Sequence, residues 1–450
     1  MQALVNTFLK YIDLNLLVNW SVQGFLDSKF NYSNKYELAR IGDFLIKSRN
    51  IVNIEDDNIY NRVTVKINNN GVILRDSEKG VNIGTKKQYL AKEGQFIISK
   101  IDARNGAFGI IPNELDNAIV TNDFPLFDVN NKKINPQFLL LITTTKVFIK
   151  FAQSCSSGTT NRQRMDIDMF LNQKIPLPKL EEQNKIVNNY LSKIFDADQL
   201  QKQSRDLEGD IEKYFICQLG LKPFSLTEKI TSLQTTDYVS LDRWDFFSTN
   251  TRIAVELKKS KFNLSSIGKS FHFTKRNFNK AQYKNKTFKY IEIGAIDPIK
   301  GILEAKEVAL NIAPSRATQL VNEGDLIIGT TRPYLKKFAI VPNEYDNNVC
   351  SSGFCVIEPS KEYHLPYLLQ FLKCIYGIEQ LKNKMTGGLY PAITELELKE
   401  IKIPFPKVEM QKQIMNLIEL EKENILNIKS SIAIIRIEAE QEFEKAIFNL

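Results

Sequence analysis

Basic, amide and hydroxyl side chains gather in four short, loop-like segments of this 450-residue sequence. Arginine can bind guanine through two hydrogen bonds, amide side chains pair with adenine, and hydroxyls serve either base. Glycines in the same segments allow the backbone to approach a ligand closely. These residue types therefore predict contacts with DNA bases and phosphates. The segments are SKIDARNGAFG (99–109), with Lys100 and Arg104; SSGTTNRQR (156–164), with Arg162, Gln163 and Arg164; GTTRPYLKKFA (329–339), with Thr330, Thr331, Arg332, Tyr334 and Lys336; and TGGLY (386–390), with Tyr390.

A strongly basic stretch, Lys258 to Lys289, adds to this prediction. It holds nine lysines, one arginine and no acid, whereas the whole chain carries a net charge of only +8. Cationic side chains that neutralise phosphates release counterions, which supplies most sequence-independent affinity for DNA. Two alternatives stay open, since the stretch can also be a solvated basic face and its interleaved aromatics can belong to a core. The cations predicted to contact DNA outside the four loops are Lys275, Arg276, Lys284 and Lys286, with Lys86 and Lys87 in the first half.

Residue patterns for catalysis are weak. The chain has two histidines and neither a GxGxxG nor a GxxxxGK[ST] loop. INPQF (134–138) resembles the Asn-Pro-Pro-Tyr/Phe motif of adenine N6-methyltransferases, but the second proline is replaced by Gln137 and no glycine-rich loop precedes it. The alternative is a helix start with Asn135 as cap and Pro136 at the first helical position. Five cysteines without metal-ligand spacing indicate buried free thiols, so we expect no metal site and no cofactor of the chain's own.

The elements that must position these loops occur twice. FGIIPNELDN (108–117) and FAIVPNEYDN (338–347) share seven of ten residues at an offset of 230. EGQFIIS (93–99) and EGDLIIG (323–329) repeat at the same offset, and IPLPKLEEQNKIV (175–187) matches IPFPKVEMQKQIM (403–415). This order predicts a tandem duplication of about 225 residues. Short β-branched runs between Gly, Asn and Pro predict a mixed α+β domain in each half, and the copied segments are interpreted as framework.

A long helix follows each Pro-x-Pro junction. The seam residues of the first helix are Tyr190, Ala197, Leu200, Ser204, Leu207, Ile211 and Tyr214. Those of the second are Ile414, Ile418, Glu421, Ile425, Ile428, Ile432, Ile435 and Ala439. Spacing by three and four is the heptad pattern of a coiled coil. We expect the two helices to pack on each other as an antiparallel pair; each could instead lie on its own domain or bind another protein.

Composition fits a globular protein with several domains, since 43% of residues are hydrophobic and 25% charged. No apolar run reaches the roughly 18 residues that span a bilayer, and the N-terminus lacks a signal-peptide pattern. We expect a cytoplasmic protein. The predicted boundaries are a recognition domain over 1–180, a helix over 181–218, a second recognition domain over 219–408 and a second helix over 409–450.

The whole chain resembles the specificity (S) subunit of type I restriction–modification systems. The resemblance rests on SKIDARNGAFGIIPNELDNAIVTNDFPLF (99–127), the SSGTT and TGGLY loops, and above all the two Pro-x-Pro-x-x-x-x-Gln-x-x-Ile junctions. It implies two target recognition domains that bind the halves of a bipartite, asymmetric DNA site, with helix length setting the spacing. It also implies docking of methyltransferase subunits, expected to number two, and of restriction subunits, so that S-adenosylmethionine, ATP and Mg²⁺ are used by the partners and this chain is not catalytic. The residues expected at the docking surface are Gln183, Ile186, Tyr190, Gln411, Ile414 and Ile418.

Two other functions stay open at this stage. The same module can serve a different effector supplied in trans. A coiled-coil scaffold with two duplicated protein-binding domains and no role on DNA belongs to a different class. The TGGLY loop lacks the Arg/Gln tail of its counterpart NRQR, which weakens the prediction for Tyr390.

Overall fold

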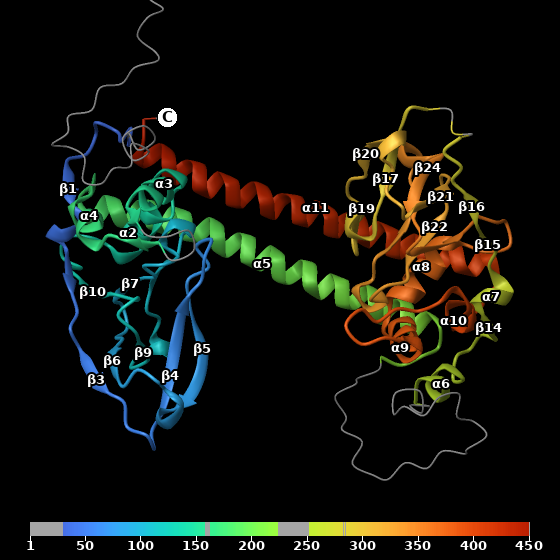
Figure 1. The fold of residues 1–450 in the computed structure, drawn as a ribbon, viewed down its shortest axis with the longest axis horizontal. Helices are drawn as coiled ribbons and strands as arrows, with labels where there is room; N and C mark the ends of the chain where they lie inside the picture. The colour runs from blue at the N-terminus through green and yellow to red at the C-terminus, as the bar shows by residue number, and fades with distance from the viewer. Residues whose placement is uncertain (1–29, 158–162, 224–251, 282, 284, 450) are drawn as a thin grey trace, which may run out of the picture. The chain divides into compact units, whose positions relative to one another are not determined.

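The computed structural model describes residues 30–157, 163–223, 252–281, 283 and 285–449. The chain divides into two compact units, which are Met1–Leu200 with Ser430–Leu450 and Gln201–Lys429. Each unit therefore contains one copy of the repeat together with a section of each long helix. The helices and many of the strands are labelled in Figure 1.

Two sheets form the α+β domain of unit 1. A four-stranded sheet has the order β2 (Leu45–Lys47), β10 (Leu126–Val129), β7 (Phe96–Ile98) and β8 (Phe108–Ile110). A five-stranded sheet has the order β3 (Ile51–Asn53), β6 (Lys87–Leu90), β9 (Ile119–Val120), β4 (Ile59–Val65) and β5 (Val72–Lys79). Two-stranded pairs join β1 (Leu38–Arg40) to β13 (Lys174–Pro176) and β11 (Ser156–Ser157) to β12 (Arg164–Met165).

Unit 2 repeats the order of these two sheets. Its four-stranded sheet has the order β15 (Phe273–Thr274), β25 (Phe354–Ile357), β22 (Leu326–Gly329) and β23 (Phe338–Ile340). Its five-stranded sheet has the order β16 (Arg276–Asn277), β21 (Ala317–Val321), β24 (Asn348–Ser351), β17 (Thr287–Ile291) and β20 (Lys306–Ala309). The two-stranded pairs are β14 (Leu264–Ser266) with β26 (Lys402–Pro404) and β18 (Ile296–Asp297) with β19 (Gly301–Ile302). The predicted duplication is thus present in the fold.

Short helices cover these sheets and close their cores. Unit 1 has α2 (Pro136–Thr143), α3 (Lys146–Ser154) and α4 (Ile167–Asn172). Unit 2 has α6 (Arg252–Leu257), α7 (Ile267–Ser270), α8 (Leu365–Lys373), α9 (Ile375–Lys384) and α10 (Glu395–Glu400). In unit 1 four phenylalanines, two from the strands and two from the helices, are fully buried against one another, namely Phe96, Phe108, Phe148 and Phe170.

The duplicated FGIIPNELDN and FAIVPNEYDN segments are framework, as predicted. Each forms a buried strand, β8 or β23, followed by a 3-10 turn, η5 (Asn113–Leu115) or η10 (Asn343–Tyr345). Each ends in an asparagine with a left-handed backbone, Asn117 at φ 62° and Asn347 at φ 52°. Asparagine tolerates this conformation better than most residues, which accounts for the repeated Asp-Asn ending.

The two long helices are α5 (Leu180–Gln218) and α11 (Val408–Ile447). In unit 1, Val187 and Ala197 of α5 and Ile432, Ala439 and Phe443 of α11 are buried. Ion pairs join Lys193 to Glu442 at 2.7 Å and Asp198 to Arg436 at 3.0 Å. From the first pair to the second, the residue number rises on α5 and falls on α11, so the helices are antiparallel there.

The same seam continues in unit 2. Ser204 and Ile211 of α5 and Ile414, Ile418, Ile425 and Ile428 of α11 are buried, and Lys429 pairs with Glu208 at 2.7 Å. The predicted α+β class with an antiparallel pair of long helices is confirmed. None of the helices within the described ranges is long and apolar enough to cross a bilayer.

Candidate nucleic-acid interface

Two of the predicted loops of unit 1 come together at the end of strand β7. The first carries the 3-10 turn η4 (Ala103–Asn105), and the second is the hairpin of β11 and β12. Arg104 Nη1 donates to Gln163 Oε1 at 2.8 Å, and the backbone N–H of Met165 donates to the carbonyl of Lys100 at 2.9 Å. Lys100, Arg104, Gln163 and Arg164 are therefore neighbours, as a common binding surface requires. Arg162 lies outside the described residues.

This first loop pair has an excess of positive charge. Arg164 binds the Asp123 carboxylate through two hydrogen bonds of 2.8 and 3.1 Å, which lowers the pKa of Asp123. Burial, and then the nearby charge of Lys47, lower the pKa of Lys100, while Asp123 opposes the shift. Arg164 and Lys100 thus share the Asp123 carboxylate, and Lys47 adds a further positive charge beside Lys100. A phosphate group placed here would relieve their mutual repulsion.

The β4–β5 hairpin supports the Arg104 loop. The backbone N–H groups of Asn68 and Asn69 donate to the carbonyls of Asn105 and Gly106 at 2.8 and 3.2 Å. Gly106 has φ 79°, and an added Cβ would lie 2.6 Å from Asn69 Oδ1. Both the backbone conformation and the close approach favour glycine at this position.

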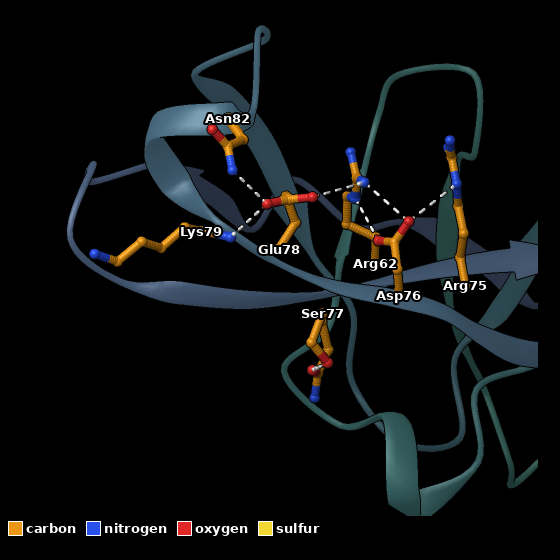
Figure 2. A network of polar contacts seen from close by, with 8 residues as sticks. Arg62, Arg75, Asp76, Ser77, Glu78, Lys79 and Asn82 are labelled. Atoms are coloured by element: carbon orange, nitrogen blue, oxygen red, sulfur yellow. Dashed lines mark hydrogen bonds and ion pairs between the residues drawn. The ribbon is translucent and has the colours of Figure 1, made fainter. Parts of the chain in front are cut away.

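A charge network holds the two strands of that hairpin together (Figure 2). Arg62 donates to both carboxylate oxygens of Asp76, at 2.6 and 2.9 Å, and Asn82 donates to Glu78 at 2.7 Å. Arg75 lies 3.5 Å from the Asp76 carboxylate on the other side. Nothing in the sequence pattern singled out this network, because Arg62 and Asp76 are 14 residues apart on different strands.

The corresponding loops of unit 2 converge on Arg332. Arg332 has a left-handed backbone, with φ 48° and ψ 56°, and its N–H donates to the Pro391 carbonyl at 2.8 Å. Its Nη2 donates to the Leu389 carbonyl at 3.0 Å, and its guanidinium lies 4.9 Å from the centre of the Tyr390 ring. The Nε is buried without a hydrogen-bond partner. Thr330, Thr331, Arg332 and Tyr390 are thus brought together.

The unit 2 loop stores backbone strain that the unit 1 loop avoids. Lys336 has φ 56° at the position where the first repeat has Gly106. A non-glycine residue in this region costs about 1–2 kcal/mol. Arg332 and Lys336 both carry this cost within five residues, so the surrounding contacts must hold the loop firmly.

The TGGLY loop is closed at its base and open at its tip. Thr386 and Ala392 exchange two backbone hydrogen bonds of 2.9 Å, and Thr331 forms a β-bridge with Ala392. Beyond this base, Leu389 is 78% exposed and Tyr390 67%. The exposure of Leu389 was not predicted, because an apolar side chain in a sequence gives no sign of its exposure. Tyr334, by contrast, packs against the core of unit 2.

The aromatic side chains of the basic stretch are structural where they are described, whereas its described lysines are exposed. Phe271 and Phe288 are buried, and Phe262, Phe273, Phe278 and Tyr283 pack against core clusters. Arg276 donates to the fully buried Asp325 at 2.5 Å and to Glu358 at 3.2 Å. We therefore interpret Arg276 as a structural residue and not as a DNA contact, because its guanidinium neutralises an internal carboxylate.

The other predicted cations lie outside the two loop pairs. Lys87, Lys275 and Lys286 are exposed. Lys86 is also exposed and pairs with Asp56 at 2.5 Å. Lys284 lies outside the described residues.

The junction glutamines are also internal. Gln183 is fully buried, accepts from the N–H of Asn135 at 2.8 Å and donates to the Lys133 and Pro178 carbonyls. Gln411 is fully buried, accepts from the N–H of His364 at 2.9 Å and donates to the Pro406 carbonyl. Each glutamine fastens a long helix to the domain of its own unit, which corrects their assignment as docking residues.

The other residues predicted to dock partner subunits differ in how deeply they are buried. Ile414 and Ile418 are buried in unit 2 and cannot present a surface, whereas Ile186 and Tyr190 are half-buried. Apolar side chains that do face solvent on α11 include Leu417, Leu420, Ile434 and Ile437.

The described residues show little sign of catalytic chemistry. Asn135 caps α2, its side chain accepting from the N–H groups of Gln137 and Phe138, so INPQF is a helix start rather than a methyltransferase motif. Burial raises the pKa of the Cys155, Cys350, Cys355 and Cys374 thiols to about 12. Cys217 differs from the prediction in being exposed. Within the described ranges, no three His, Cys, Asp or Glu side chains are grouped as metal ligands.

Comparison with known proteins places both repeats in one family. The sequence model described as "Type I restriction modification DNA specificity domain" matches residues 33–208 and again 257–432. The HindI type I restriction enzyme specificity subunit of Haemophilus influenzae is 31% identical over 109 residues, which are 23% of this chain and 24% of that protein. The match thus spans about a quarter of the relative's length.

A solved structure shares the fold. A chain from a structure of complex assembly and conformational transition in a type I R-M system is 15% identical, with a TM-score of 0.55 over 93% of this chain and 99% of that one. A type I restriction–modification S subunit from M. genitalium is 12% identical, with a TM-score of 0.48 over 93% and 98% of the two chains.

Proposed function

Because the chain belongs to the type I restriction–modification DNA specificity family, we propose that it recognises a bipartite DNA site through two half-sites. The loop pair at Arg104 and Gln163 contacts one half-site, and the loop pair at Arg332 and Tyr390 contacts the other. The chain performs no catalysis and directs methyltransferase and restriction subunits, which use S-adenosylmethionine, ATP and Mg²⁺, to that site.

The observation that carries this proposal is a repeated position with different chemistry. Both repeats bring a loop after β7 or β22 against a second loop that precedes α4 or α10. The framework around these loops is copied, while one loop pair presents Arg104 with Gln163 and the other presents Arg332 with Tyr390, from positions that do not correspond in the two repeats. Copied framework with diverged loops is expected when one fold serves two different targets.

Methylome sequencing tests the bipartite site. The chain is co-expressed with its cognate methyltransferase in a host without other adenine modification. We expect one new motif with two specified halves and an unspecified spacer. Arg104→Ala should relax or abolish specificity in one half and Arg332→Ala in the other, with each bidentate base contact contributing about 1–3 kcal/mol. Methylation of a single undivided motif would contradict the proposal.

Docking is proposed on the exposed apolar positions of α11. Leu417 and Leu420 are 55% and 64% exposed, and apolar side chains on a charged helix surface are typical of an interface. Co-purification of methyltransferase subunits should fall with Leu417→Ser/Leu420→Ser. The matched control is Lys412→Ser/Glu419→Ser, which changes exposed polar positions of the same helix. Equal co-purification by both double variants would exclude this surface.

The scaffold alternative makes a different prediction for DNA. Recognition through phosphates requires an affinity that falls steeply with salt concentration. A scaffold without a role on DNA requires no such dependence. Titration of the assembled complex with a duplex carrying the methylated motif, at about 50 and about 200 mM salt, separates the two.

A further inference from the structure

We propose that the tip of the TGGLY loop, Leu389 with Tyr390, is a wedge that inserts between stacked bases of the DNA. This inference rests on the proposed function, since it assigns a mode of binding to the second half-site. Leu389 would separate two neighbouring base pairs, and the exposed face of the Tyr390 ring would stack on a base beside the gap.

The loop is built to hold these side chains in place. Two backbone hydrogen bonds between Thr386 and Ala392 close its base. The Thr331–Ala392 bridge and the hydrogen bond from Ile393 N–H to the Thr330 carbonyl, at 3.0 Å, join it to the strand before Arg332. Gly387, at φ 99°, provides the turn that leads to the tip.

Arg332 braces the tip from below. Its Nη2 holds the Leu389 carbonyl, and its guanidinium lies over the Tyr390 ring. One face of the ring is thereby covered, while the residue remains 67% exposed. Arg332 makes these contacts although its backbone is left-handed and its buried Nε has no hydrogen-bond partner, and both features are unfavourable. Their presence indicates that the position of the tip matters.

A wedge explains the exposure of Leu389 better than an ordinary surface position does. A single exposed leucine needs no explanation, but this one stands 78% exposed at the tip of a braced loop beside an aromatic ring. Apolar side chains inserted between base steps unstack and kink the duplex, and aromatic rings stack on bases regardless of sequence.

Charge favours DNA as the occupant. The guanidinium of Arg332 lies at the base of the wedge, where it contacts the Leu389 carbonyl and the Tyr390 ring. A cation placed behind an apolar tip suits a duplex, whose phosphates flank the base steps. An apolar protein surface would offer this charge no anionic partner.

The fluorescence of 2-aminopurine measures the predicted unstacking. Once methylome sequencing has given the motif, two duplexes are made, each with 2-aminopurine in place of a purine of one half-site other than the adenine that is methylated, because the methyltransferase itself flips that adenine out of the stack. Each duplex is titrated with the chain assembled with its methyltransferase subunits. We expect fluorescence to rise on binding, and Leu389→Ala to remove most of this rise in one duplex only.

Three comparisons make the test specific. Leu396→Ala is the control, because Leu396 is 74% exposed in the same unit but lies on α10. Leu389→Phe should retain the signal, since another apolar side chain can fill the gap. Affinity should fall on the order of tenfold for Leu389→Ala, because the variant no longer buries a leucine side chain between the base pairs.

The outcomes separate the two levels of the proposal. If the wild-type complex binds no specific duplex, the proposed function fails. If it binds and methylates, and Leu389→Ala matches wild type in fluorescence and affinity, the wedge is overturned and the function stands. Loss of signal in both duplexes would also overturn the wedge, because unit 2 serves one half-site.

Discussion

Replacement of Arg276 by methionine should destabilise unit 2 without a direct effect on base contacts. Asp325 is fully buried, and Arg276 is its cationic partner at 2.5 Å; the backbone N–H of Asn322 also donates to it at 2.7 Å. Removing one partner of a buried ion pair leaves an uncompensated charge and costs about 3–5 kcal/mol. We expect Arg276→Met to lower the free energy of unfolding by this amount.

The first repeat suggests how to repair the variant. Gln95 occupies the position equivalent to Asp325, donating to Asp128 at 2.7 Å and accepting from the N–H of Lys92 at 2.9 Å. Glu358 corresponds to Asp128 at the same offset. The double variant Arg276→Met/Asp325→Gln replaces the buried carboxylate with an amide that can donate to Glu358. It should recover most of the lost stability, because a buried charge no longer needs a cation.

Hydrogen exchange measured by mass spectrometry on the full chain is the assay. Peptides that cover β22 and β25 report on unit 2, and peptides that cover β7 and β10 serve as the internal reference in unit 1. Lys275→Met is the matched control, since Lys275 is the exposed neighbour and its loss should stay within about 0.5 kcal/mol. Unchanged protection in Arg276→Met combined with weaker DNA binding would refute the structural role and restore Arg276 to the DNA surface.

The remaining predictions concern buried polar groups. Burial lowers the pKa of Lys373 from 10.5 to about 7, so between these values the unfolded chain binds more protons than the folded one. The free energy of unfolding should rise by up to about 1.4 kcal/mol per pH unit between the two pKa values. Urea denaturation at several pH values should show this rise in the wild type and a weaker dependence on pH in Lys373→Met. Gln183→Leu should lower the free energy of unfolding by about 1–3 kcal/mol, because it leaves the Asn135 N–H and two carbonyls without their partner. Gln411→Leu should have the same effect in unit 2. Thermal melts compare each variant with Gln413→Leu, which changes an exposed glutamine of α11, and equal melting temperatures would contradict the prediction.

The sequence predicted the features that depend on local pattern. The duplication, the strand and turn of the copied segments, the cap at Asn135 and the seam of the long helices all follow from periodicity, turn chemistry and spacing. These signals lie within a few residues of one another, or recur at a fixed offset, so one sequence is enough to find them.

Features that depend on tertiary burial could not be predicted in this way. Arg276 sits in a run of ten cations, and nothing local distinguishes it from its neighbours, because Asp325 is 49 residues away. Leu389 and the core phenylalanines are equally apolar, yet one is exposed and the others are fully buried. Gln183 and Gln411 stood out as members of a repeated motif, but the motif does not say whether they face a partner or the interior.

The C-terminal end of α11 determines the order in which the two units can complete their folding during synthesis. Phe443, Ile447 and Phe448 belong to the core of unit 1, where Tyr32 stacks on Phe448 at 5.2 Å and the N–H of Ser33 donates to the Ile447 carbonyl. A ribosome delivers residues 30–200 well before these three. The first domain to emerge must therefore wait for these three residues to be translated before its core is complete, while all of unit 2 is already available. Chains that stop short of Phe443 should lose unit 1 to proteolysis and keep unit 2, the reverse of the usual advantage of an early-synthesised domain.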